Sequence, residues 1–128
     1  MSKKKIKVLI VEDEIALRQA MVDKFTREGF WTFAAKDGED GLNQALTERP
    51  DIILLDIIMP NMDGLTMLKI LRNDQEWGKD VPVMVLTNLS DVDNVSRAVE
   101  NGVYEFLVKS DWRLDDLVDK VKEKLHFK

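Results

Sequence analysis

Residues suited to handling a phosphoryl group follow four short apolar runs in this chain. The runs and the residues after them are Ile6–Val11 before Glu12 and Asp13, Ile52–Leu55 before Asp56, Val81–Leu86 before Thr87, and Val103–Val108 before Lys109. If the runs are parallel strands of one sheet, they end at one edge, where open α/β sheets bind their ligands. Three carboxylates, a hydroxyl and an ammonium would then share a crevice able to hold a divalent cation and accept a phosphoryl group.

The acidic members of this set indicate a hard cation. Glu12, Asp13 and Asp56 would repel one another at close range unless a cation offsets their charge. Oxygen ligands, with no Cys or His nearby, favour Mg²⁺ or Mn²⁺ over zinc. We expect Asp13 and Asp56 to bind the cation directly and Glu12 to act through a water molecule. The alternative is that Glu12 and Asp13 only stabilise the start of a helix, where acidic side chains are favoured.

Asp56 is also a candidate nucleophile, because an aspartate can accept a phosphoryl group as an acyl phosphate. The cation would neutralise charge on the phosphoryl oxygens. Lys109 would add a positive charge, and Thr87 would add a hydroxyl. Taken singly, Lys109 is explained as a surface lysine and Thr87 as a β-branched residue that ends a strand, so the inference depends on their shared position at strand ends.

Strand-like and helix-like segments alternate along the whole chain and predict how these residues are positioned. Helical patterns occupy Glu14–Glu28, Gly38–Arg49, Gly64–Arg72, Asp91–Asn101 and Arg113–Lys124, and a further strand is expected at Phe30–Ala35. Expected helix N-caps are Asp13, Asp63 and Ser90, with Gly29 just past a helix end. Alternating units predict an α/β fold with a doubly wound parallel sheet of order 2-1-3-4-5 and helices on both faces.

Length and composition predict one globular domain over residues 1–128, with a core from about residue 6 to residue 126. Of the 128 residues, 45% are hydrophobic and 34% charged, and the net charge of −5 argues against nucleic acid as a direct partner. The absence of cysteine fits a reducing cytoplasm. The first apolar stretch is too short for a signal peptide and none is long enough for membrane insertion, so we expect a cytoplasmic protein.

Several blocks of the sequence resemble the receiver domains of two-component response regulators. The matching blocks are Val11–Glu14, Leu55–Gly64, Val85–Thr87 and Phe106–Lys109, together with Gly29–Phe30 and Ala35–Gly38. The resemblance covers essentially the whole chain, and the type it indicates is a stand-alone, single-domain receiver like the chemotaxis regulators. It implies a flavodoxin-like (βα)5 fold and a phosphoprotein that acts in signal transduction or a phosphorelay.

The resemblance implies a role for each acidic residue. Asp56 would be the phosphoacceptor. Mg²⁺ would be held by Asp13, Asp56 and the backbone carbonyl of Ile58, with Glu12 assisting.

It also implies a switch. Thr87 would move toward the phosphoryl group on activation, and Lys109 would pair with a phosphoryl oxygen. Phe106 stands at the aromatic switch position and would turn inward as Thr87 moves. Tyr104 is a rival for that role, although its distance from Lys109 fits less well.

The partners implied are signalling proteins. A sensor histidine kinase or a phosphotransfer protein would donate the phosphoryl group, so the chain would catalyse only its own phosphorylation and dephosphorylation. The sequence ends soon after the receiver, so we expect no output domain. Output would then depend on an unknown protein partner or on onward transfer of the phosphoryl group, through a surface from about residue 90 to residue 124. The expected state is a monomer or a phosphorylation-dependent homodimer.

Two residues beside the site depart from the family pattern. Ser110 follows Lys109 where the family usually has proline, often after a cis bond. A cis bond before serine costs about 3 kcal/mol or more, so we expect a trans bond. Asn88 replaces a small residue, and with Ile58 and Leu89 it is expected to hinder an attacking water and prolong the acyl phosphate.

The expected edge strand carries two aromatic residues, Trp31 and Phe33. We expect both to pack beneath a neighbouring helix. A partner-binding surface is the alternative, because exposed apolar patches mark interaction sites.

Three other functions remain open. An aspartate-nucleophile phosphatase would normally carry a second acid two residues after the nucleophile, where this chain has Ile58. A flavin carrier of the same topology would need a phosphate loop where this chain has the acidic Glu12–Glu14. A receiver-like scaffold that is never phosphorylated would have no need of Asp56, Thr87 and Lys109 together.

Overall fold

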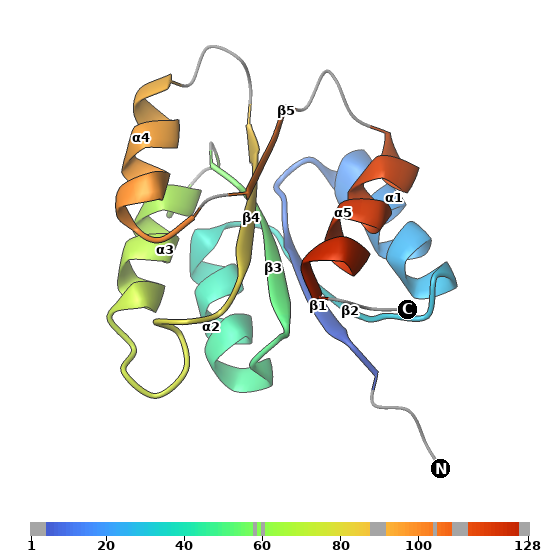
Figure 1. Ribbon diagram of the computed structural model, residues 1–128, viewed down its shortest axis with the longest axis horizontal. Coiled ribbons are helices and arrows are strands. Elements are labelled where there is room, and N and C mark those ends of the chain that lie inside the picture. The colour runs from blue at the N-terminus through green and yellow to red at the C-terminus, as the bar shows by residue number, and fades with distance from the viewer. Residues whose placement is uncertain are drawn as a thin grey trace.

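Five parallel strands and five helices alternate in the computed structural model of the protein (Figure 1). The structure describes residues 5–57, 59, 61–87, 92–103, 105–108 and 113–125, without the side chains of residues 87, 92–95, 105 and 108. The strands are β1 (Lys7–Val11), β2 (Trp31–Ala35), β3 (Ile52–Asp56), β4 (Val83–Thr87) and β5 (Glu105–Val108). The helices are α1 (Ile15–Arg27), α2 (Gly38–Glu48), α3 (Gly64–Arg72), α4 (Val92–Glu100) and α5 (Leu114–Leu125).

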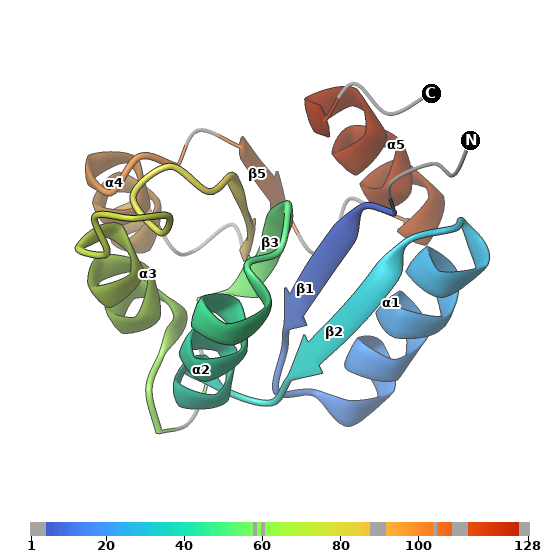
Figure 2. The ribbon, with the colours of Figure 1, turned by 90° about the horizontal axis from the view of Figure 1, so that it is seen from below.

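The strands form one parallel sheet in the order β2-β1-β3-β4-β5, which confirms the predicted topology. Helices α1 and α5 lie on one face of the sheet, and α2, α3 and α4 lie on the other (Figures 1 and 2). Val11 at the end of β1 is in register with Leu55 near the end of β3. The residues that follow Val11 and Leu55 therefore emerge side by side.

Alternate residues of the strands face two separate apolar cores. In β1, Val8 and Ile10 pack with α1 and α5, whereas Leu9 and Val11 pack with α2, α3 and α4. Because both faces are covered, four of the five β1 residues and all of β3 are buried. This burial explains why the strands are continuous apolar runs rather than alternating ones.

Two of the predicted strands begin two residues later than their apolar runs, because main-chain groups at the start of each run bond elsewhere. The carbonyl of Val81 accepts from Arg72 Nη1 at 2.7 Å, and Pro82 has no N–H to donate. Likewise, the Val103 N–H donates to the Ala98 carbonyl at the end of α4. Strands β4 and β5 therefore start at Val83 and Glu105.

The helix ends confirm two of the predicted caps and correct a third. Asp63 Oδ1 accepts from the Thr66 N–H at 2.8 Å, and Gly29 has a φ of +96°. Asp13 was predicted to be the N-cap of α1, but the helix begins at Ile15 and its N-cap is Glu14. The Glu14 N–H donates to Glu12 Oε2 at 3.0 Å. The expected cap Ser90 lies outside the described residues.

The two aromatic residues of β2 behave differently. Phe33 packs against the core on the α2 side, as predicted. Trp31 is 49% exposed, so the prediction that it packs beneath a helix is wrong. Trp31 is the first residue of an edge strand that has a neighbour only on the β1 side, which leaves part of its ring in water. In the part of the chain that the structure describes, no helix has the length and apolar character needed to cross a membrane.

Candidate functional site

Three carboxylates gather where the strands end, which we call the carboxyl edge of the sheet. Glu12, Asp13 and Asp56 each place one carboxylate oxygen within 4.8 Å of the others. Glu12 is fully buried and Asp56 is 6% exposed, while Asp13 is partly exposed and opens the group to solvent. The β1–β3 pairing that was predicted from the apolar runs brings them together.

The turn that carries Glu12 and Asp13 is braced from α1. Arg18 Nη1 donates to the main-chain carbonyl of Glu12 at 3.0 Å and approaches that of Asp13 at 3.5 Å. Arg18 was not among the site residues predicted from the sequence. Its position four residues after Glu14, one turn into an expected helix, was the signal that could have placed it beside this turn.

Asp56 ends a fully buried strand, and its main chain is covered by the start of α3. The Gly64 N–H donates to the Ile57 carbonyl at 2.8 Å. A Cβ atom on Gly64 would lie 2.3 Å from the Asp56 carbonyl oxygen, so this close approach requires glycine. The backbone at Asp56 is therefore held by the strand that precedes it and by the start of α3 that packs on it.

The chemistry of this donor set fits a hard divalent cation. All three groups offer oxygen, which suits Mg²⁺, and Mg²⁺ generally takes only one or two carboxylates and keeps several waters. Two of the groups are buried, where neighbouring negative charges repel strongly unless a cation offsets them. Among the described residues, this is the one group of three or more His, Cys, Asp or Glu side chains that is close enough to share an ion.

The other predicted site residues are described only in part. The main chain of Thr87 ends β4 at the same edge, in register with Val108 of β5, but its side chain is not described. Phe106 of β5 is partly buried and packs against the core on the α2–α4 side.

The remaining site residues that the sequence singled out lie outside the described residues. They are Ile58, Asn88, Leu89, Tyr104, Lys109 and Ser110. The expected trans bond after Lys109 and the expected shielding by Asn88 therefore stay predictions.

A second pair of polar residues lies beside the site and was missed in the sequence. Asp37, between β2 and α2, is only 5% exposed. Its Oδ1 accepts from the Asp40 N–H at 2.9 Å, and its Oδ2 accepts from Asn61 Nδ2 at 2.9 Å. The Asp40 N–H, followed by the Asn61 amide, lowers the pKa of Asp37 against the opposing effect of burial. Asp37 was part of a matching family block, but nothing in the sequence pointed to Asn61 as its partner.

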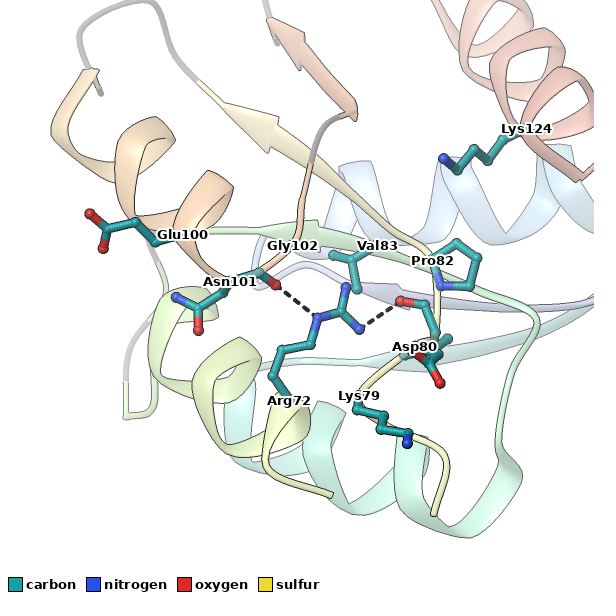
Figure 3. A pocket seen from close by; sticks show the side chains of 10 residues that line it. Arg72, Lys79, Asp80, Pro82, Val83, Glu100, Asn101, Gly102 and Lys124 are labelled. Atoms are coloured by element: carbon teal, nitrogen blue, oxygen red, sulfur yellow. Dashed lines mark hydrogen bonds between the residues drawn. The ribbon is translucent and has the colours of Figure 1, made fainter. Parts of the chain in front are cut away.

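The opposite, amino edge of the sheet carries a pocket of about 450 Å³ around Arg72 (Figure 3). The Arg72 guanidinium donates to the carbonyls of Asn101, Gly78 and Val81, at 2.8, 2.9 and 2.7 Å. Burial lowers the pKa of Arg72. Because Arg72 binds main-chain groups of two loops, it acts as a structural tie between α3 and those loops.

Known proteins are similar in sequence to this chain over most of its length. A family model described as "Response regulator receiver domain" matches residues 8–122. Sporulation initiation phosphotransferase F of Bacillus subtilis (strain 168) is 33% identical over 122 residues, which is 95% of each chain. The probable transcriptional regulator ycf27 of Guillardia theta is 38% identical over 105 residues, covering 82% of this chain. The match covers only 40% of the length of that regulator.

Solved structures share the fold. The Vibrio cholerae chemotaxis protein CheY4 superposes with a TM-score of 0.85 at 28% identity, covering 94% of this chain and 98% of CheY4. The signal receiver domain of a signal transduction histidine kinase from Syntrophus aciditrophicus gives a TM-score of 0.80 at 30% identity, covering 91% of this chain and 87% of that domain. Similarity in both sequence and fold therefore extends through the carboxylate site.

Proposed function

Because the chain belongs to the family of response regulator receiver domains, we propose that it is a signalling switch phosphorylated on Asp56. The observation that carries the proposal is the position of the Asp56 carboxylate. It lies nearly buried at the end of β3, with an oxygen within 4.8 Å of oxygens of Glu12 and Asp13. A nucleophile held between two acids is suited to a reaction in which a divalent cation offsets the negative charge of the incoming phosphoryl group.

The proposed reaction transfers a phosphoryl group from a phosphohistidine to Asp56. A carboxylate oxygen of Asp56 attacks phosphorus, so that a P–O bond forms as the P–N bond of the donor breaks. The electron pair of the broken bond goes to the imidazole nitrogen, which takes up a proton from solvent. The closely packed main chain around Asp56 restricts where its carboxylate can lie, which would favour an in-line approach.

The residues available for Mg²⁺ are Asp13, Asp56 and the main-chain carbonyl of Ile58, with Glu12 acting through water. When bound, Mg²⁺ supplies charge neutralisation for the phosphoryl oxygens. Mn²⁺ is the alternative cation, because it accepts the same oxygen ligands. The burial of Glu12 and its bond to the Glu14 N–H support an indirect role for Glu12, since one of its oxygens is already engaged.

Thr87 and Lys109 are proposed to bind the phosphoryl oxygens, and Phe106 is proposed to turn inward as Thr87 moves. Thr87 ends β4 at the carboxyl edge, one residue past the position in register with Asp56. Phe106 is only partly buried against the core, so its side chain is not fully enclosed. Phosphorylation would then bias a two-state surface on α4, β5 and α5.

The proposed phosphoryl donor is a sensor histidine kinase or a phosphotransfer protein. Similarity over 95% of both chains to a protein named a sporulation initiation phosphotransferase supports a place in a phosphorelay. The phosphoryl group would then be passed on, or the altered surface would bind another protein. A monomer or a phosphorylation-dependent homodimer is consistent with either route.

Phosphorylation by a small donor tests the proposal directly. The purified protein is incubated with acetyl phosphate and Mg²⁺, and the intact mass is measured for wild type, Asp56→Asn and Asp63→Asn. Asp63→Asn is a matched control, because Asp63 caps α3 in the same loop and asparagine can keep that cap. We expect one added phosphoryl group on wild type and on Asp63→Asn, and none on Asp56→Asn or after chelation of Mg²⁺. An unmodified wild type, or labelling of Asp56→Asn, would refute the proposal.

A further inference from the structure

We propose that the hydrogen bond between Asp37 and Asn61 positions the loop after Asp56 for cation binding. The loop joins β3 to α3, and the inference rests on the proposed function because it concerns the same cation site. Asp37 and Asn61 are positioning residues in this proposal, since neither belongs to the carboxylate group itself.

The loop is held from outside by the segment between β2 and α2. Asn61 Nδ2 donates to Asp37 Oδ2 at 2.9 Å, and the Gly38 N–H donates to the Met62 carbonyl at 2.8 Å. The β2–α2 connection and the start of α3 lie at the same edge of the sheet (Figure 2). Two successive residues of one segment therefore bind two successive residues of the other.

This contact between the two segments is close and specific. A Cβ atom on Gly38 would lie 2.4 Å from the Met62 carbonyl oxygen, so the loop fits only against glycine. Asn61 has a φ of +62°, in the left-handed region that asparagine adopts more readily than most residues. The Asn61 side chain thus leaves a sharp turn and meets a buried carboxylate.

Asp37 uses its two oxygens for different purposes. Oδ1 caps α2 through the Asp40 N–H, and Oδ2 binds the Asn61 amide. Hydrogen bonds to an ionised carboxylate are stronger than those between neutral groups. Since α2 packs against β1 and β2, the bridge ties the loop to the rigid part of the fold.

The bridge matters for the cation because of where the proposed main-chain ligand stands in the sequence. Ile58 is flanked by Ile57, whose carbonyl accepts from the Gly64 N–H, and by Asn61, which Asp37 holds. The loop begins directly after Asp56, whose carbonyl lies against Gly64, so its two anchors act on the chain that leaves the carboxylate site. Loss of the Asn61 anchor would loosen this chain, so that Asp56 and the proposed ligand at residue 58 would no longer be held together. Residues that orient ligands in this way change metal affinity about 10–100-fold when they are altered.

Reversing the polarity of the bridge gives a test that separates positioning from charge. Asn61→Asp places a carboxylate against Asp37 and should break the bridge. Asp37→Asn combined with Asn61→Asp should restore it. The side chain at position 37 can then accept from the Asp40 N–H through its amide oxygen and donate through its amide nitrogen to the carboxylate at position 61. The double variant has the same formal charge as wild type. Asp63→Asn, in the same loop but outside the bridge, is the control.

Mg²⁺ affinity is measured by calorimetry without a phosphoryl donor, and folding is checked by urea titration. We expect Asn61→Asp to weaken Mg²⁺ binding about tenfold, with the double variant and Asp63→Asn close to wild type. A purely electrostatic effect would give the opposite sign, because Asn61→Asp adds a negative charge near the cation. Asn61→Gly, which keeps the turn and removes the amide, should weaken binding even if Asn61→Asp fails to fold.

The outcomes also distinguish this inference from the proposed function. Unchanged or tighter Mg²⁺ binding by both Asn61 variants, with wild type still labelled on Asp56, would overturn the bridge alone. Failure of the double variant to recover affinity while it folds normally would do the same. Absence of Mg²⁺ binding and of labelling in wild type would overturn both.

Discussion

At the amino edge of the sheet charged side chains bind main-chain groups, whereas at the carboxyl edge three carboxylates lie together. Arg72 donates to three carbonyls, and Lys7 Nζ donates to the Glu48 carbonyl at 2.9 Å. Asp51 Oδ2 accepts from the Lys7 N–H at 2.8 Å. Three of these five bonds join residues 29 or more positions apart, so charge at the amino edge ties distant segments of the fold together.

The carboxyl edge uses charge for a different purpose. Glu12, Asp13 and Asp56 have like charges within 4.8 Å, an arrangement that opposes folding unless a cation is bound. Binding sites commonly reduce stability in this way for the sake of function. The comparison therefore predicts opposite effects when the charges of the two edges are removed.

The largest effect is expected at the amino edge. Arg72→Ala would leave three carbonyls without their donor in a half-buried pocket, and should lower the free energy of unfolding by about 3 kcal/mol. Urea titration measures the change. Lys69→Ala, at an exposed position of the same helix, should change stability by no more than about 0.5 kcal/mol. Equal stability of the two variants would show that Arg72 does not tie the loops together.

A smaller effect of opposite sign is expected at the carboxyl edge. Asp13→Asn removes one of three like charges and should raise the free energy of unfolding by about 1 kcal/mol when Mg²⁺ is absent. Mg²⁺ at ten times its dissociation constant should stabilise wild type by about 1.4 kcal/mol and the variant much less. Asp119→Asn, an exposed change on α5, serves as the charge-matched control. A less stable Asp13→Asn in metal-free buffer would contradict the contrast between the edges.

The carboxyl edge was largely predictable from sequence because it depends on strand ends. Parallel strands end at one edge, so Asp13 and Asp56 could be placed together once their apolar runs were assigned to neighbouring strands. The prediction failed by one residue at the cap of α1, because Asp is a favoured N-cap residue whereas Glu14 takes the position without a side-chain cap hydrogen bond. The Glu14 carbonyl, which accepts from the Arg18 N–H at 2.9 Å, shows where the helix begins.

The amino edge and the bridge beside the site were not predictable. Arg72 is a basic residue in the last turn of a helix, where it is favoured by the helix dipole in any case. Its partners are main-chain carbonyls, which have no signature in the sequence. The bond between Asp37 and Asn61 depends on a left-handed turn at Asn61, and side-chain pairing across two loops follows no periodic pattern.

The smallest expected effect concerns acid, and it tests whether the edges differ in more than the carboxylate group. At the amino edge, the N–H groups of Gly78 and Trp77 lower the pKa of Asp74. An aspartate in the unfolded chain has a pKa of about 3.9, so below that pH the unfolded state binds the proton first. The stability that Asp74 contributes is therefore present above pH 4 and lost as the pH falls toward its lower folded pKa.

Asp74→Asn should flatten the decline of the free energy of unfolding in this window, measured by urea titration at several pH values. Asp37→Asn at the carboxyl edge should flatten it too, because the pKa of Asp37 is lowered by the same kind of bond. If only one variant flattened the decline, the contribution of loop carboxylates to stability would differ between the two edges. The difference between the edges could then not be assigned to Glu12, Asp13 and Asp56 alone.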